Sequence, residues 1–238
     1  MVQQALDHLG GCTYVEIGVE NGATLRAVQA ARRIGVDPQF LGRRMRVKLG
    51  VSRVKRALRL RNGDLLFDMP SDKFFASEQQ LLRRHPIDVA LVDGLHTAEQ
   101  SLRDIEHCLR YGAQSSLIVV HDCNPQSECA ALPTLGVALR HPEFTGEWNG
   151  DVYRAIVRLR ATRADLNVCV LDCDEGVGVV TQGEPDDMLD LSDPEIDEMT
   201  YEDLVVDRGR LLNLRPPAHL EEVLDRVCDP RFNGHDPT

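Results

Sequence analysis

The stretch IDVALVDGLHTAEQSLRDIEHCLRYG, residues 87–112, has the pattern of a strand followed by a helix. Its first part, IDVALVD (87–93), is a nearly continuous apolar run bounded by charge, which is typical of a parallel strand buried on both faces. Its second part places Leu102, Ile105 and Leu109 on one helical face and ends at Gly112. A strand followed directly by an amphipathic helix is the repeating unit of an α/β fold.

The same alternation extends in both directions from this stretch. Strands are predicted at 12–18, 34–37 and 116–120, helices at 2–9, 23–33, 77–84 and 151–160, and a pair of strands around a turn at 167–180. This order predicts an α/β domain with a mainly parallel sheet, helices on both faces and one antiparallel strand from the last pair. We expect this domain to span residues 1–183, with an acidic, helical C-terminal extension (184–238) packed on it.

Composition excludes several classes of protein. The chain has 238 residues, a formal net charge of -11 and a pI of about 5.2, so its field would repel nucleic acid and anionic membranes. It has no signal-like N-terminal segment, and no apolar run approaches the roughly 18 residues that span a bilayer. The seven cysteines form no C-x-x-C pair, which argues against a disulfide framework or structural zinc. We therefore expect a soluble, cytoplasmic protein that binds neither nucleic acid nor membrane.

Charge is unevenly distributed along the chain. Residues 43–61 contain nine Lys or Arg and no acid, whereas residues 184–207 contain eleven acids and no base. Each run is consistent with a solvated surface. Alternatively, the basic run borders an anionic ligand, or the two runs face each other within one chain or across a homodimer.

Acidic residues follow several of the predicted strands. In parallel α/β sheets ligands bind outside the carboxyl ends of the strands, which makes these positions candidates for a site. They are Glu16, followed by Gly18, then Asp37, Asp93 and the pair His121-Asp122.

The turn VEIGVENGATL (15–25) has glycines at 18 and 22 directly before a helix, although it lacks the G-x-G-x-x-G dinucleotide fingerprint. Such glycines let the backbone approach a ligand, and the helix N-terminus then points its amides at it. Asp37 lies 19 residues beyond Gly18, where a carboxylate can accept hydrogen bonds from the hydroxyls of a ribose. A plain strand-to-helix turn remains the alternative.

Four further motifs complete a family pattern: MPSDKFFAS (69–77), VDGLHTAEQSLRDIEHCLR (92–110), VVHDCNP (119–125) and WNGDVYRAIVRL (148–159). With the glycine turn and Asp37, they resemble the class I S-adenosylmethionine (SAM) dependent methyltransferases. Within that class, the motifs are most similar to small bacterial metal-dependent O-methyltransferases that act on sugars and natural products. The resemblance covers about residues 12–180 and implies a Rossmann-like fold with a seven-stranded sheet.

The resemblance implies a binding site for SAM. Gly18 and its turn would hold the methionine part, Asp37 the ribose, and Ser71 with Asp72 the adenine edge. The full set implied for the cofactor is Glu16, Gly18, Asn21, Gly22, Asp37, Ser71, Asp72 and Asp93. Taken alone, Ser71 and Asp72 after a proline are equally typical of a turn.

The resemblance also implies a divalent metal, Mg²⁺ or Mn²⁺, bound by Asp93, His121 and Asp122. His96, three residues after Asp93, would be the general base. A cation can hold a substrate hydroxyl, lower its pKa and align it with the methyl group. His121 departs from the pattern, because these families usually have a carboxylate there and Mg²⁺ prefers oxygen ligands. Either the ion accepts imidazole, as Mn²⁺ does, or Asn124 supplies an oxygen, or the site has lost its metal.

The irregular stretch 124–150 is long for a loop and is typical of a lid over a substrate. His141, Trp148 and Asp151 are candidates to line an acceptor pocket, with Trp148 stacking on a sugar ring. The sequence thus predicts a SAM-dependent O-methyltransferase acting on a hydroxyl of a sugar, glycoside or oligosaccharide. The alternatives are metal-independent methylation of another small metabolite and a non-catalytic SAM-binding partner subunit.

Overall fold

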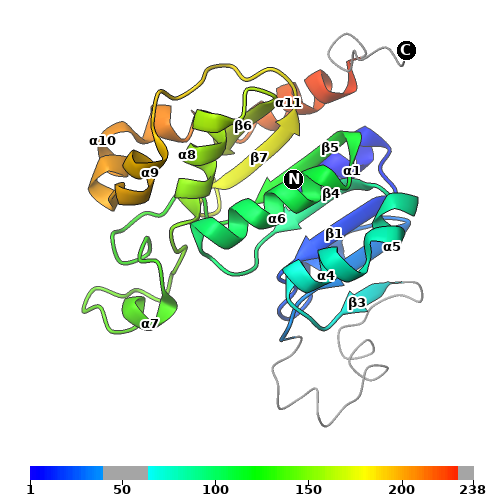
Figure 1. The fold of residues 1–238 in the computed structure, drawn as a ribbon, viewed down its shortest axis with the longest axis horizontal. Coiled ribbons are helices and arrows are strands. Elements are labelled where there is room, and N and C mark those ends of the chain that lie inside the picture. Colours follow the sequence, from blue (N-terminus) through cyan, green and yellow to red (C-terminus); the bar gives the residue numbers. More distant parts are fainter. Residues whose placement is uncertain (40–63, 230–238) are drawn as a thin grey trace.

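A computed structural model describes residues 1–39 and 64–229, and within them one sheet has the strand order β3-β2-β1-β4-β5-β7-β6-β8 (Figure 1). The strands are β1 Thr13–Ile17, β2 Arg32–Val36, β3 Leu65–Phe67, β4 Ile87–Val92, β5 Gly112–Val120, β6 Leu166–Leu171, β7 Val177–Gln182 and β8 Leu214–Arg215. β7 is antiparallel to β5 and β6, and the other neighbours are parallel. The predicted α/β fold with one antiparallel strand is confirmed. Within the described ranges the sheet has one strand more than the predicted seven, because the two-residue β8 from the C-terminal segment pairs with β6.

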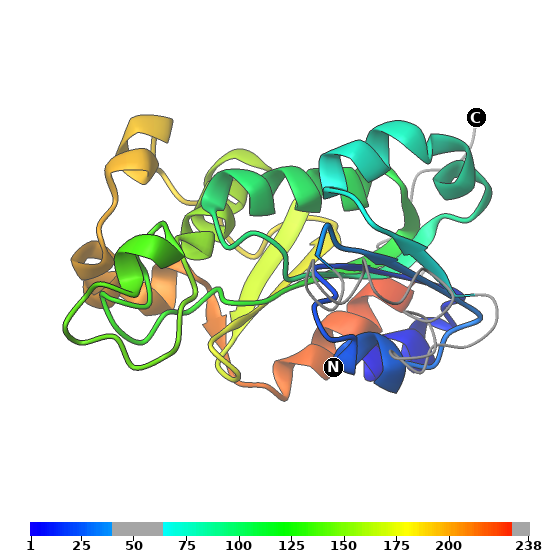
Figure 2. The same cartoon turned by 90° about the horizontal axis from the view of Figure 1, so that it is seen from below.

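Helices cover both faces of the sheet (Figure 2). On one face the core joins α4 (Ser71–Ser77), α5 (Gln79–Arg84), α6 (Ala98–Arg110) and α8 (Val152–Thr162) to the sheet, together with α9 (Asp193–Glu198) and α10 (Tyr201–Leu211). On the other face lie α1 (Val2–Leu9), α2 (Ala23–Ala27) and α11 (His219–Cys228). The remaining helix of the described residues, α7 (Leu135–Ala138), lies within the predicted lid.

Strand β4 lies in the middle of the sheet and faces both layers. Val89 and Leu91 pack into the core under α1 and α11, whereas Ala90 and Val92 pack into the core under α6. Burying each Val or Leu side chain is worth roughly 1.5–3 kcal/mol. The continuous apolar run of the sequence therefore reflects burial on both sides, as predicted.

Helix α2 is shorter than the predicted helix 23–33, because Val28 is already extended and β2 begins at Arg32. The Arg33 side chain, which is 2% exposed, lies beneath the helix and donates from Nη1 to the carbonyl oxygens of Leu25 and Val28. Its Nε donates to Asp64 Oδ1 at 2.8 Å. Arg33 thus satisfies carbonyls that a longer helix would have bonded internally, which is why the chain can leave the helix early.

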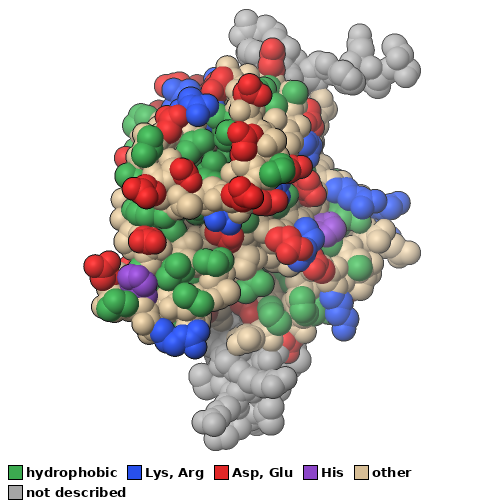
Figure 3. Space-filling model, turned by 60° about the vertical axis from the view of Figure 1, so that its left-hand side comes forward, with side chains coloured by type: hydrophobic (Ala, Val, Ile, Leu, Met, Phe, Trp, Pro, Cys, Tyr) green, Lys and Arg blue, Asp and Glu red, His purple; other side chains and the backbone are tan. Residues whose placement is uncertain are grey.

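The C-terminal segment contributes to both layers. Leu204 and Leu211 join the core with α8, and Leu220 and Leu224 of α11 join the opposite core. The acids of the run 184–207 are exposed except for the half-buried Asp207, and acidic side chains gather on the face formed by α9 and α10 (Figure 3).

Several of these acids pair with arginines of the same chain. Arg158 of α8 bonds to Asp193 and Asp197, while Asp186 lies within 3.4 Å of Arg215 and 2.9 Å of Arg226. The basic run 43–61 lies outside the described residues. No helix in the described part of the chain is both long and apolar enough to span a membrane.

Candidate active site

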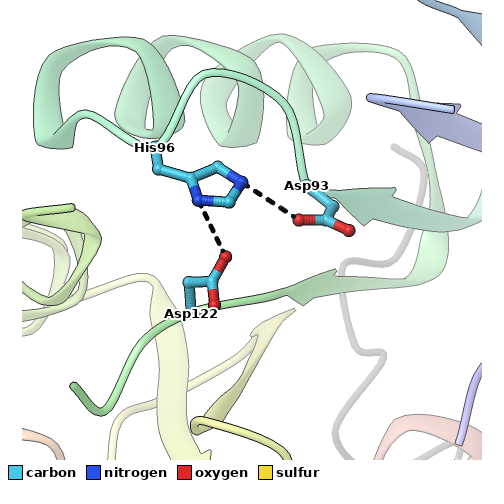
Figure 4. A group of neighbouring side chains, drawn as sticks. All are labelled: Asp93, His96 and Asp122. Atoms are coloured by element: carbon cyan, nitrogen blue, oxygen red, sulfur yellow. Dashed lines mark ion pairs between the residues drawn. The ribbon is translucent and has the colours of Figure 1, made fainter. Parts of the chain in front are cut away.

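Two acids meet where the parallel strands β4 and β5 end. Asp93 follows β4 and Asp122 follows β5, and because the two strands are paired in parallel, both residues lie at one edge of the sheet. His96 lies in the turn between β4 and α6, with its ring between the two carboxylates (Figure 4). One ligand atom each of Asp93, His96 and Asp122 lies within 4.8 Å of the others.

The His96 ring is held on both of its nitrogens and on one face. Nε2 lies 3.4 Å from Asp93 Oδ1, and Nδ1 lies 3.0 Å from Asp122 Oδ2 and 3.1 Å from the carbonyl oxygen of Trp148. The Trp148 indole stacks on the ring with centroids 5.1 Å apart and planes inclined by 17°. His96 therefore has a fixed orientation, which is a requirement for a group that transfers a proton or binds an ion.

His121 reaches the same two carboxylates from the end of β5. Its Nδ1 lies 3.2 Å from Asp122 Oδ1 and 3.7 Å from Asp93 Oδ1, while its Nε2 lies 3.4 Å from Asp174 Oδ2. The site consequently contains two imidazoles and two carboxylates, with Asp174 as a third acid at the exposed side.

The two imidazoles and Asp122 influence one another's ionisation. A hydrogen bond to Asp122 and the nearby acids raise the pKa of His121 to about 9, although burial opposes this. Burial lowers the pKa of His96, but hydrogen bonding to Asp93 and the charge of Asp122 outweigh it, so its pKa lies above the ordinary value. Burial raises the pKa of Asp122, yet the hydrogen bond from His121 and both histidine charges bring it below the ordinary value. The carboxylates thus favour the charged form of both imidazoles.

The donor set fits a divalent cation. Carboxylate oxygens bind hard ions, and imidazole nitrogens shift the preference toward Mn²⁺ and other transition metals rather than Mg²⁺. A cation would compete with protons for the imidazole nitrogens.

Asp122 adopts a left-handed backbone conformation with φ of 63°, which few residues other than glycine adopt. Its Oδ1 accepts a hydrogen bond of 2.6 Å from Asn149 Nδ2. Asn149 is 1% exposed, and its Oδ1 has no hydrogen-bond partner among the described residues. Backbone strain and a buried polar atom of this kind concentrate at functional sites.

A cavity of about 410 Å³ adjoins the cluster. Its lining includes the strand ends at Ile17, Gly18, Val36 and Asp37, the start of α4 at Ser71, and Gly94, Leu95, Gln100 and Asp104 from the turn after β4 and from α6. This volume is within the range of small-molecule sites.

Gly18 shapes one wall of the cavity. It has a φ of +86°, and a Cβ at this position would overlap the carbonyl oxygen of Asp93. Only glycine lets β1 and β4 approach this closely. The Asp37 carboxylate fixes the turn after Gly18, because its Oδ2 accepts hydrogen bonds from the amides of Val19 at 3.0 Å and Glu20 at 2.7 Å.

The sequence of this chain is similar to that of one known protein family. A sequence family described as a methyltransferase domain matches residues 15–123, which include both the glycine turn and the Asp93–Asp122 cluster. Residues 15–123 therefore resemble a methyltransferase domain. No curated protein sequence matches the chain.

Two solved structures illustrate the likeness of the whole fold to that of known proteins. The O-methyltransferase TomG from Streptomyces achromogenes, involved in tomaymycin synthesis and solved with SAM, has a TM-score of 0.51, 15% identity, and alignment over 76% of this chain and 77% of TomG. The O-methyltransferase from Bacillus cereus, in complex with S-adenosylhomocysteine (SAH), has a TM-score of 0.53, 12% identity, and alignment over 76% of this chain and 78% of its own. At these low sequence identities, the structural similarity shows that the fold is shared and no more.

The residues predicted to bind the cofactor divide into two groups. Gly18, Asp37 and Ser71 line the cavity, and Asp93 contacts the Gly18 turn through its backbone, with its amide donating to Ile17 O at 2.9 Å. The remaining predicted residues of the methyltransferase domain lie outside the lining: Glu16, Asn21, Gly22 and Asp72.

Each residue of the second group has another partner. Glu16 points to the face of the sheet that α1, α2 and α11 cover. There it accepts a hydrogen bond of 2.7 Å from the Tyr14 hydroxyl. Asn21 accepts from the amide of Ala23 at the start of α2, and Gly22 is the N-cap of that helix with a φ of 73°. Asp72 accepts from Gln100 at 3.2 Å on the exposed side of α4.

The residues predicted for the lid also differ in placement. Trp148 reaches His96, but Asp151 accepts from the Ala98 amide at 2.8 Å and so caps α6. His141 bonds to the amide of Glu143 within the loop. Asn124, an alternative oxygen ligand, directs its Oδ1 to Arg208 Nη1 at 2.5 Å, away from the cluster.

Four residues at or beside the site were not predicted as site residues, although they lie within the quoted motifs: Asp104, Gln100, Asn149 and Gly150. Asp104 and Gln100 are ordinary polar positions of an amphipathic helix, and Asn149-Gly150 is a common turn pair. The signal that could have identified Asp104 is its position one turn after Gln100 on the buried side of α6, where an acid is unusual.

Proposed function

We propose that the chain is a SAM-dependent O-methyltransferase that acts on a hydroxyl of a sugar, glycoside or oligosaccharide, with a divalent metal and with His96 as general base. One observation carries this proposal: the cavity and the acid–imidazole cluster adjoin at Asp93-Gly94, since Gly94 lines the first and Asp93 belongs to the second. A methyl donor in the cavity and a hydroxyl at the cluster would therefore be neighbours.

The donor assignment rests on the cavity and on the fold. TomG was solved with SAM and the Bacillus cereus enzyme with SAH, and both have the fold of this chain. In this chain Gly18 has no side chain to fill the cavity. The Asp37 carboxylate lines the cavity, where it could accept a hydrogen bond from a polar group such as a ribose hydroxyl. SAM supplies an electrophilic methyl group, so the protein needs to align the acceptor and remove one proton.

The acceptor assignment rests on the cluster. Asp93, Asp122 and His121 would hold the cation, which polarises the acceptor hydroxyl when bound. His96 would take the hydroxyl proton at Nε2, while Nδ1 is oriented by the Trp148 carbonyl. A sugar is proposed as acceptor because Trp148 is only half-buried and sits at the cluster, where the exposed part of its indole can contact a sugar ring.

The experiment is an intact-mass screen in which the protein is incubated with SAM and a panel of sugars and glycosides, with and without EDTA. A gain of one methyl group on a sugar hydroxyl, abolished by EDTA and restored by Mn²⁺, is the expected result. Transfer that survives exhaustive chelation would favour metal-independent catalysis by the histidine pair. Transfer only to a non-sugar hydroxyl, such as that of a phenol in the same panel, would refute the sugar assignment.

The role of His96 has its own test. His96→Ala should lower kcat by roughly 10²- to 10⁴-fold, the usual size of a lost acid–base contribution, and should leave SAH affinity unchanged because the ring does not line the cavity. His141→Ala is the matched control, since His141 bonds only within its own loop among the described contacts. A His96→Ala enzyme with near-normal kcat would refute the assignment.

A further inference from the structure

The α6 side of the cavity contains a buried acid that the proposed reaction does not use. Asp104 is 1% exposed and lines the cavity together with Ser71 and Gln100. Its Oδ2 lies 3.9 Å from the point where a Cβ on Gly94 would stand. Because Gly94 has no side chain, none covers this oxygen from the Gly94 side of the cavity.

Hydrogen-bond donors are scarce around this acid. Gln100 Nε2 faces three acceptors, namely Asp104 Oδ1 at 3.1 Å, Ser71 Oγ at 3.2 Å and Asp72 Oδ1 at 3.2 Å. A carboxamide nitrogen has only two hydrogens, so at least one of these contacts is not a full hydrogen bond. The orientation of the amide is fixed, because Gln100 Oε1 accepts from Arg103 Nη2 at 2.6 Å.

Among the described residues, no ion pair compensates for this shortage of donors. The ion pairs of Arg103 go to Glu99 and Asp72, on the exposed side of the helix. Burial raises the pKa of Asp104 to about 6, although hydrogen bonds from Ser71 and Gln100 oppose the rise. A buried carboxylate with open acceptor positions is costly unless a donor meets it. A ligand that brings N–H groups to this wall would supply that donor.

We propose that Asp104, oriented by Gln100 and Ser71, recognises the exocyclic amino group of adenine and makes the cavity selective for adenine over hypoxanthine. The assignment rests on the proposed function, since it takes SAM as the ligand of the cavity. It replaces Asp72, which is exposed and does not line the cavity, as the acid that binds the adenine edge. Hypoxanthine carries an oxygen where adenine carries the amino group, and that oxygen would face the Asp104 carboxylate with no hydrogen between them.

Calorimetry with two ligands tests the proposal on the full chain. The ligands are SAH and S-inosylhomocysteine, which differ only in the base: an oxygen replaces the amino group and N1 carries a hydrogen. The wild-type protein should bind SAH about 10- to 100-fold more tightly, as expected for hydrogen bonds to a charged group. Asp104→Asn should weaken SAH binding by a similar factor and should largely remove the preference, because an amide can donate to the hypoxanthine oxygen. Asp72→Asn is the matched control and should retain both the affinity and the preference.

The outcomes separate this inference from the proposed function. No binding of SAH to the wild-type protein would overturn the proposed function and the inference with it. Tight SAH binding with equal affinity for S-inosylhomocysteine would overturn only the role of Asp104, and would assign its open oxygen to the ammonium group of the methionine part or to no ligand. The wild-type comparison decides this even if Asp104→Asn does not fold. A preference lost in Asp72→Asn and kept in Asp104→Asn would also contradict the proposal.

Discussion

Gly150 lies at the end of the segment 124–150 and packs against the backbone of His96, so replacing it with alanine should disturb His96 directly. Gly150 has a φ of +65°, and a Cβ there would lie 2.8 Å from the carbonyl carbon of His96, 3.0 Å from its Cβ, and still closer to its carbonyl oxygen. Because the nearest atoms are backbone, no side-chain rotation relieves the overlap. The segment 148–150, or the turn that carries His96, has to move.

The size of the effect follows from a comparison with Gly146. Gly146 also has a positive φ, +106°, but a Cβ there would have no atom within 4 Å. Gly146→Ala should therefore cost only the backbone term of about 1–2 kcal/mol. Gly150→Ala should cost the same plus about 1–3 kcal/mol of overpacking. For a chain of this size, each kcal/mol lowers Tm by about 2–4 °C, so Gly150→Ala should melt clearly below Gly146→Ala.

Two measurements check this reasoning. Thermal melting gives the difference in stability, and NMR of the imidazole nitrogens, with His96→Ala for assignment, reports the environment of the His96 ring. Gly150→Ala should shift the His96 signals and lower kcat, since a displacement of about 1 Å at a reacting group can cost about 10²-fold. Gly146→Ala should leave both unchanged. Equal melting temperatures, or unchanged His96 signals in Gly150→Ala, would refute the idea that this close contact positions the histidine.

Three further predictions concern the donor cavity, the metal and a buried acid. Asp37→Ala should weaken SAH binding by about 10- to 100-fold, because it removes both the proposed ligand contact and the bonds that hold the turn after Gly18; unchanged affinity by calorimetry would contradict this. Asp93→Ala and Asp122→Ala should fold but lose Mn²⁺ binding, measured by calorimetry or by electron paramagnetic resonance of free Mn²⁺; wild-type affinity in either variant would exclude that ligand. Burial raises the pKa of Glu16 from 4.5 to about 7, so its contribution to stability is greatest below pH 4.5 and is lost as pH rises through about 7. Glu16→Gln should therefore gain about 2 kcal/mol of unfolding free energy relative to wild type between pH 5 and pH 8 in denaturant titrations, and a pH-independent difference would contradict the shift.

The sequence by itself determined the α/β class and the edge of the sheet that carries the site. Continuous apolar runs such as 87–92 indicate burial on both faces of the sheet. The glycine turn after β1 indicates that the backbone closely approaches a neighbouring group. The spacing of Asp93 and His96 is local, so one turn brings both to the strand end. His121 and Asp122 follow the adjacent strand, and parallel pairing brings them to the same place.

Tertiary structure alone decided which residues complete the site. Trp148 and Asn149 reach His96 and Asp122 across 52 and 27 residues of chain, and no local pattern specifies contacts at that separation. Helix propensity favoured a longer α2. However, the buried Arg33 donates hydrogen bonds to carbonyl oxygens at the end of this helix, and β2 begins early. Asp72 and Asp104 are both acids near the cavity, and only the packing of α6 against α4 directs one outward and the other inward. Local sequence fixes which residues can form a strand end or a helix face, whereas the side chain that faces the ligand depends on distant segments packing together.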